Sequence, residues 1–127
     1  LIKKAHECKI KNKKIFELWG TGKPLRELIY VDDVADACVY FMKKNIKETL
    51  INIGTGKDMR IRDYAKFLIK KLNLKVKIKY NKKKPDGVYR KVLDVKLAKK
   101  YGWKSKFTLD KGFKITYRDF LKNYKNK

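Results

Sequence analysis

Short apolar segments that alternate with amphipathic helical segments constrain the fold of this chain most strongly. Residues 15–19 form an apolar run typical of a short strand, and a Gly/Pro turn at residues 20–24 ends it. The pattern recurs at residues 50–53, where a strand-like run ends at Gly54-Thr55-Gly56. Strands that alternate with helices predict an α/β architecture. The chain offers only about four short strands, so we expect its elements to complete a larger domain.

Apolar periodicity also marks the other elements. Residues 28–31 form another short apolar run, and a further strand is predicted where apolar residues alternate with lysines, at residues 76–80. Asp32 or Asp33 is expected to cap a helix, and Gly102 is expected to end one. The helices are predicted over residues 1–9, 34–42, 61–72, 94–102 and about 109–124.

The length and composition suit one folded unit. A chain of 127 residues with 43% hydrophobic residues can bury one modest core. It opens at Leu1, already inside a predicted helix, which suggests truncation of a longer protein. No apolar run reaches the roughly 18 residues that span a bilayer, and no secretion signal is visible, so a cytoplasmic protein is expected. Cys8 and Cys38 are accordingly predicted to be free thiols.

The formal net charge of +23 first suggests a polyanionic partner such as nucleic acid or an anionic membrane surface. Lysines outnumber arginines 31 to 5 and are scattered along every segment, whereas direct base readout favours arginine. A lysine-biased genome produces the same pattern without functional meaning. We therefore expect most lysines to be solvated surface, with no nucleic-acid partner and no membrane partner.

Several strings of residues resemble a known family. Residues 18–37 are similar to the extended short-chain dehydrogenase/reductase superfamily and its NAD-dependent epimerase/dehydratase family. Trp19 followed seven residues later by Arg26, and the string Lys84-Pro85-Asp86-Gly87, are most similar to the GDP-L-fucose synthases within it. The resemblance covers essentially the whole chain.

This resemblance implies a function and a place in a longer protein. Enzymes of the family convert GDP-4-keto-6-deoxy-D-mannose to GDP-L-fucose by epimerisation and NADPH-dependent reduction. Residues 1–127 are expected to form the C-terminal nucleotide-sugar (substrate) binding domain of such a chain, a homodimer whose N-terminal Rossmann domain binds NADP. No catalytic, cofactor-binding or metal-binding residue is expected here, and His6 is interpreted as a helix-surface residue.

Two candidate residues combine physical reasoning with the resemblance. Arg26 follows a Gly/Pro turn, where its guanidinium could bind the diphosphate of a nucleotide sugar through two hydrogen bonds. The alternative is a surface salt bridge to Glu27 or Asp32. Trp19 could contact the sugar, although a tryptophan that ends a strand is ordinarily a core residue, and both roles can coexist.

Four more candidates depend mainly on the resemblance. Lys4 and Lys77 fall where the family carries arginines, so they keep the positive charge for a phosphate but lose the planar fork. Asp86 lies in a turn and could accept from a nucleobase or ribose donor. Lys91, with Arg90 beside it, follows within reach of the same anion.

Other patterns have plainer explanations. Gly54-Thr55-Gly56 precedes a helix and could cradle a phosphate, but the family context favours a structural turn. The acidic residues Asp32, Asp33 and Asp36 are explained by capping and surface roles without a metal. Two other functions remain open: a different nucleotide-sugar epimerase or dehydratase of the same superfamily, and a basic nucleic-acid-binding module.

Overall fold

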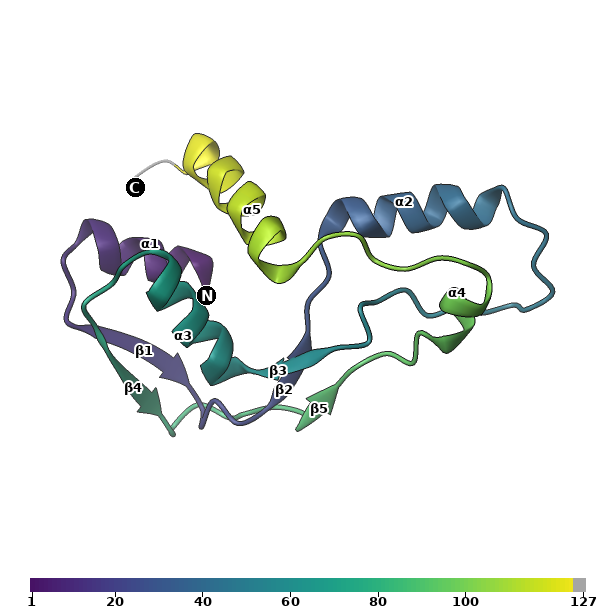
Figure 1. Cartoon of the computed structure of the whole chain (residues 1–127). Helices are drawn as coiled ribbons and strands as arrows, with labels where there is room; N and C mark the ends of the chain where they lie inside the picture. Colours follow the sequence, from purple (N-terminus) through teal and green to yellow (C-terminus); the bar gives the residue numbers. More distant parts are fainter. Residues whose placement is uncertain (125–127) are drawn as a thin grey trace. The chain divides into compact units, whose positions relative to one another are not determined.

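The computed structural model describes residues 1–124 and divides the chain into two compact units. The first unit comprises residues 1–26 and 58–91, and the second begins with residues 27–57 and continues from residue 92. Helices and strands are interspersed along the chain (Figure 1), as the α/β prediction requires. The elements are α1 (Ile2–Ile10), β1 (Ile15–Trp19), β2 (Leu25–Glu27), α2 (Val31–Met42), β3 (Asp58–Arg60), α3 (Ile61–Lys71), β4 (Lys77–Asn81), β5 (Arg90–Lys91), α4 (Lys96–Lys100) and α5 (Leu109–Asn123).

The core of the first unit lies between two helices and a pair of parallel strands. β1 and β4 pair from Ile15 opposite Lys77 to Trp19 opposite Asn81. β1 buries every second residue, with Phe16 and Leu18 inward, which is the alternation expected of a strand with one face in water. α1 contacts β1 and α3 (Figure 1), and α3 buries one apolar face against this core.

A second, three-stranded sheet has the order β3-β2-β5. β2 and β5 are parallel, with Leu25 opposite Arg90 and Arg26 opposite Lys91. The alternation of apolar residues does not mark these strands, because each has only two or three residues. The sequence pattern therefore did not predict β2, the strand that positions Arg26.

The second unit packs around Ala37, Ala98 and Trp103, which are at most 3% exposed. Residues 50–53 were expected to form a strand, and this prediction is wrong: Ile51 and Ile53 pack against that core without strand structure. Their side chains are apolar because they are partly buried, which the sequence pattern cannot distinguish from strand pairing. α4 and α5 lie where the sequence predicts them, and the Thr108 hydroxyl caps α5 by accepting from the Lys111 amide.

Two further expectations need correction. His6 is not a surface residue, since it is only 7% exposed on the face of α1 that also buries Ala5 and Cys8. Neither aspartate caps α2 in the expected way, because the helix begins after Tyr30 without a side-chain cap. The prediction of two free thiols is confirmed, and no helix among residues 1–124 is long and apolar enough to cross a membrane.

α2 is apolar on the face that it turns away from its core. Its inward face carries Ala37, whereas its outward residues recur at helical spacing and are all exposed, with Met42 84% exposed. α2 also contains no lysine or arginine, in a chain that has 36 of them. We call this the α2 face; it consists of Val31, Val34, Ala35, Cys38, Val39 and Met42.

We expect the purified chain to self-associate through the α2 face, because contiguous exposed apolar surface of this kind is uncommon in monomers. Replacing Val39 with lysine places a charge at its centre and should raise the dimer dissociation constant about tenfold or more. Sedimentation equilibrium measures this constant. Leu50→Lys is the matched control, since Leu50 is 75% exposed and lies outside α2. A wild-type chain that stays monomeric at high concentration would contradict the prediction.

Candidate functional site

A sharp glycine turn follows β1 in the first unit. Trp19 ends the strand, and the Gly20 amide donates to the Asn81 carbonyl at 2.9 Å. Gly20 and Gly22 have φ values of +70° and +68°, a region that residues with a side chain rarely adopt. A Cβ atom on Gly20 would lie 2.1 Å from Oδ1 of Asp86. The turn therefore needs glycine both for its backbone and for the close approach of Asp86.

Asp86 holds this turn closed. Its two carboxylate oxygens accept from the amide and from the hydroxyl of Thr21, each at 2.6 Å. The Thr21 hydroxyl, followed by the Thr21 amide, lowers the pKa of the Asp86 carboxyl. The sequence interpretation made Asp86 an acceptor for a nucleobase or ribose. In the structure Asp86 joins residues 82–87 to the Gly20 turn, and any ligand contact would use its remaining lone pairs.

Trp19 lies next to this turn and is 57% exposed, so it is not the core residue that a strand end usually carries. Two lysine ammonium groups lie over its ring: Nζ of Lys4 is 4.5 Å and Nζ of Lys84 is 5.4 Å from the ring centroid. The Trp19 indole N–H donates to the Glu17 carboxylate at 3.2 Å. The hydrogen bond to Glu17 therefore fixes the orientation of the indole, and two positive charges lie over its ring.

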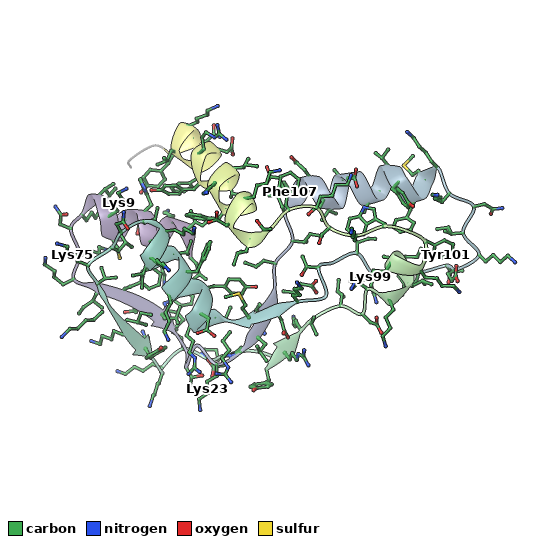
Figure 2. The ribbon with its side chains drawn as sticks, in the orientation of Figure 1. Lys9, Lys23, Lys75, Lys99, Tyr101 and Phe107 are labelled. Carbon is green, nitrogen blue, oxygen red and sulfur yellow. The ribbon has the colours of Figure 1, made fainter. Side chains whose placement is uncertain are left out.

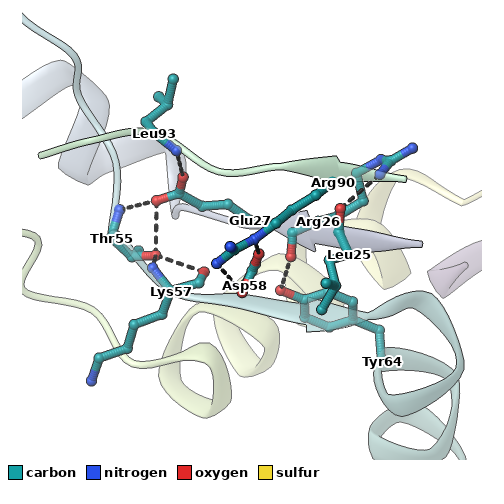
Figure 3. A network of polar contacts seen from close by, with 9 residues as sticks. All are labelled: Leu25, Arg26, Glu27, Thr55, Lys57, Asp58, Tyr64, Arg90 and Leu93. Atoms are coloured by element: carbon teal, nitrogen blue, oxygen red, sulfur yellow. Dashed lines mark hydrogen bonds and ion pairs between the residues drawn. The ribbon is translucent and has the colours of Figure 1, made fainter. Parts of the chain in front are cut away.

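Arg26 lies on the other side of the Asp86 loop. Its guanidinium Nη2 is 3.7 Å from the position that a Cβ atom would take on Gly87, the residue after Asp86. Nη1 donates to the Leu25 carbonyl at 2.6 Å, and the Tyr64 hydroxyl donates to the Arg26 carbonyl at 2.9 Å (Figure 3). Within residues 1–124 Arg26 forms no ion pair, so the salt bridge that was its alternative role is not made.

The two remaining lysine candidates differ in position. Lys91 is the β5 partner of Arg26, so the register places two positive residues side by side. Lys77 pairs with Ile15 at the start of β4, four residues before the Asn81 that pairs with Trp19. At about 3.3 Å per residue, Lys77 stands about 13 Å along the strand from the turn. Trp19, Arg26, Asp86 and Lys91 lie at or beside the Asp86 loop, and Lys4 lies over Trp19, whereas Lys77 lies at the opposite end of the strand pair.

Arg90 does not share the role considered for Lys91. Its Nε donates to the Asp58 carboxylate at 2.6 Å, and Figure 3 shows the two side chains meeting. The hydrogen bond and charge of Asp58 raise the pKa of Arg90. Arg90 is therefore engaged in joining β5 to β3, two strands of the same unit that are not neighbours in the sheet.

In the second unit, the Gly54-Thr55-Gly56 turn binds a carboxylate of the protein itself, that of Glu27. The Glu27 carboxylate accepts from the Thr55 amide and, on its other oxygen, from the Leu93 amide at 2.8 Å (Figure 3). It also accepts from the Gly56 amide at 2.7 Å. Burial would raise the pKa of Glu27, but the Leu93 and Gly56 amides and the Thr55 donors outweigh it and lower the pKa. The alternative of a phosphate cradle is wrong here, because Glu27 already occupies the amides.

The two Gly-Thr-Gly-Lys strings of the chain share one local structure. In each, the threonine donates its amide and hydroxyl to a distant carboxylate, Asp86 for Thr21 and Glu27 for Thr55. Each threonine hydroxyl also accepts from the lysine amide two residues later, at 3.2 Å. We call these the two carboxylate clamps. The recurrence of the string was the signal that could have identified Thr21 and Thr55 from the sequence, but it does not identify the carboxylates that bind them.

The aspartates of α2 have structural partners in the second unit. Asp33 is 1% exposed and accepts from the amides of Lys106 and Phe107 at 2.9 and 3.1 Å. Asp36 accepts from the Trp103 indole N–H and the Lys106 ammonium, and the Lys106 hydrogen bond lowers its pKa most. No group of three metal-ligating side chains occurs in the described part of the chain.

Most lysines are exposed and widely spread. Figure 2 labels four that come from different places, Lys9 on α1, Lys23 in the Gly20 turn, Lys75 before β4 and Lys99 on α4, and all four are exposed. This distribution agrees with a solvated surface rather than one continuous basic patch.

Comparison with known proteins shows which sequences and structures the chain is similar to. Residues 1–54 match a model of the NAD dependent epimerase/dehydratase family. GDP-L-fucose synthase 1 of Arabidopsis thaliana is 36% identical, over 100% of this chain and 39% of its own length. GDP-L-fucose synthase of Escherichia coli is 36% identical, over 97% of this chain and 41% of its own length. The chain thus spans about two fifths of the curated relatives that it matches.

Solved structures agree with this comparison. GDP-mannoheptose C4 reductase from Campylobacter jejuni, solved with NADP bound, is 30% identical with a TM-score of 0.80, over 94% of this chain and 43% of that one. A GDP-L-fucose synthetase from Naegleria fowleri reaches a TM-score of 0.85 at 24% identity, over 98% of this chain and 38% of that one, which supports the fold alone. The predicted α/β fold is confirmed.

Proposed function

We propose that this chain is part of an enzyme of the NAD dependent epimerase/dehydratase family, whose model matches residues 1–54, and that it forms the nucleotide-sugar-binding part of an NADP-dependent enzyme that acts on a GDP-sugar. The finer proposal is a GDP-L-fucose synthase, which epimerises GDP-4-keto-6-deoxy-D-mannose at two carbons and reduces its ketone. Residues 1–127 would then act as its substrate-binding domain, with catalysis and the homodimer contact in the rest of the enzyme.

The observation that carries this proposal is the location of the predicted site residues. Although they are spread over residues 4–91, all six fall in the first compact unit. Four of them, Trp19, Arg26, Asp86 and Lys91, lie at or beside the loop that closes on the Gly20 turn.

Each group would then have a distinct role. Arg26 would bind the diphosphate through two parallel hydrogen bonds, with Lys91 and Lys4 adding positive charge. Trp19 would offer an apolar surface to the sugar. Lys77 could contact only the end of the same ligand that lies farthest from the Gly20 turn.

The residues present do not fit NADP. A dinucleotide diphosphate needs free backbone amides at a glycine turn, and the amides of Thr21, Thr55 and Gly56 already donate to Asp86 and Glu27. No step of the reaction is therefore assigned to this chain, and the cofactor is proposed to bind elsewhere in the enzyme.

Calorimetric titration of the 127-residue chain tests the proposal. We expect saturable binding of a GDP-sugar, weaker binding of the matching UDP-sugar, and no oxidation of NADPH when the 4-keto sugar nucleotide is added. Preference for the UDP-sugar would favour another enzyme of the superfamily, such as the putative UDP-glucose 4-epimerase of Methanocaldococcus jannaschii, which is 34% identical over 76% of this chain. Salt-sensitive binding of random DNA without selective GDP-sugar binding would favour a nucleic-acid module, and NADPH turnover would refute the division of roles.

A further inference from the structure

Lys84 is not one of the candidate site residues predicted from the sequence, yet its ammonium lies over Trp19 with that of Lys4. The two lysines are far apart in the sequence of the first unit: one comes from α1 and the other from the loop after β4. We infer that Lys84 is a phosphate-binding residue that acts with Lys4 at the edge of Trp19. This inference rests on the proposed function and adds a residue to its site.

The backbone fixes the position of Lys84. Trp19 pairs with Asn81 at the end of β4, and the Lys84 amide donates back to the Asn81 carbonyl at 3.2 Å. Two residues later, Asp86 is joined to Thr21 by its two 2.6 Å hydrogen bonds. The loop is therefore anchored to the Trp19 turn on both sides of Lys84, which directs this lysine over the indole.

The closeness of the two ammonium groups indicates where an anion would bind. Both ammonium distances run to the same ring centroid, so the two groups lie no more than about 10 Å apart, near one Debye length at 0.1 M salt. Neither lysine has a carboxylate within ion-pair distance among residues 1–124. Contact with the indole stabilises each cation only modestly at an exposed site. An anion between them would be attracted by both, and the diphosphate of a nucleotide sugar supplies such an anion.

The neighbouring residues provide matched controls. Lys82 and Lys83 are exposed members of the same loop, and among the described residues the ammonium groups that lie over the Trp19 ring are those of Lys4 and Lys84. Substituting Lys84, Lys83 or Lys82 with glutamine removes the same charge from the same loop. General attraction of an anion to a chain of +23 would weaken equally in all three variants.

The test compares Lys84→Gln with Lys83→Gln for binding of GDP and of inorganic pyrophosphate by calorimetry. We expect Lys84→Gln to weaken both ligands about three- to tenfold, and Lys83→Gln to change them less than about twofold. Equal losses in the two variants would overturn the inference while leaving the proposed function intact. A loss for GDP but not for pyrophosphate would also overturn it, because Lys84 would then contact the nucleoside.

A second readout examines the position of Lys84 without ligand. Trp19 is exposed and the other tryptophan, Trp103, is 3% exposed, so acrylamide quenching of fluorescence reports mainly on Trp19. Removing the ammonium over the ring should increase quenching in Lys84→Gln but not in Lys83→Gln. Identical quenching would contradict the placement. Absence of GDP binding by the unmodified chain would instead refute the proposed function.

Discussion

Replacing Arg26 with lysine is expected to weaken binding of a GDP-sugar about ten- to a hundredfold, although the charge is unchanged. The guanidinium has five N–H donors, and among residues 1–124 only Nη1 is used internally, in its bond to the Leu25 carbonyl. That bond and its place in β2 fix the direction of the fork. An ammonium cannot span two diphosphate oxygens, so one charge-assisted hydrogen bond, worth about 1.5–3 kcal/mol, is lost.

Calorimetric titration of the chain with a GDP-sugar measures this change. Arg118→Lys is the matched control, because Arg118 is an exposed arginine of α5 in the other unit and its substitution should leave the affinity unchanged. In the complete enzyme, NADPH binding should also be unchanged by Arg26→Lys. An affinity within about twofold of the parent would show that Arg26 does not bind the diphosphate through two bonds, leaving a contribution under about 1 kcal/mol.

Replacing Gly20 with alanine is expected to lower the free energy of unfolding by about 2–4 kcal/mol. Part of the loss comes from the backbone, since a φ of +70° costs a residue with a Cβ atom about 1–2 kcal/mol. The rest comes from the clamp, because the new Cβ would lie 2.1 Å from Asp86 and displace its carboxylate from Thr21.

Gly87→Ala separates these two contributions. Gly87 has a similar φ of +72°, but the nearest atom to an added Cβ lies 3.7 Å away, so this variant carries the backbone strain without the clash. We expect it to lose only the backbone part, about 1–2 kcal/mol, in urea unfolding followed by circular dichroism. Equal losses for the two glycines would show that the clamp contributes nothing measurable to stability.

The sequence predicted the helices well and the short strands poorly, for a physical reason. α3 and α5 have long apolar stripes that only a helix aligns, whereas β2 and β5 have two or three residues and are defined by their partners. Residues 50–53 show the opposite error. Their apolar side chains are partly buried although the backbone pairs with no neighbouring strand. Local pattern reports the tendency to be buried, and the pairing that makes a strand depends on distant residues.

Prediction of the candidate site had the same limit. The positions of Arg26 and Lys91 in one strand pair agree with a shared anion, but this register could not be derived from either segment alone. The involvement of Asp86 with Thr21 required a contact across 65 residues, and the same contact brings Lys84 to Trp19. The exposure of the α2 face could not be predicted from the sequence, because helical spacing identifies an apolar stripe but not what covers it.

The chain order of the two units determines what happens when the backbone is cut. Each unit contains two separate segments, and each carboxylate clamp joins the segments of its own unit: Asp86 binds Thr21 in the first, and Glu27 binds Leu93 in the second. A protease nick between residues 57 and 58 would therefore give two pieces that each carry half of both units. Such pieces stay associated until both units unfold, so the nicked protein behaves as a pair of complementing fragments rather than as two separable domains.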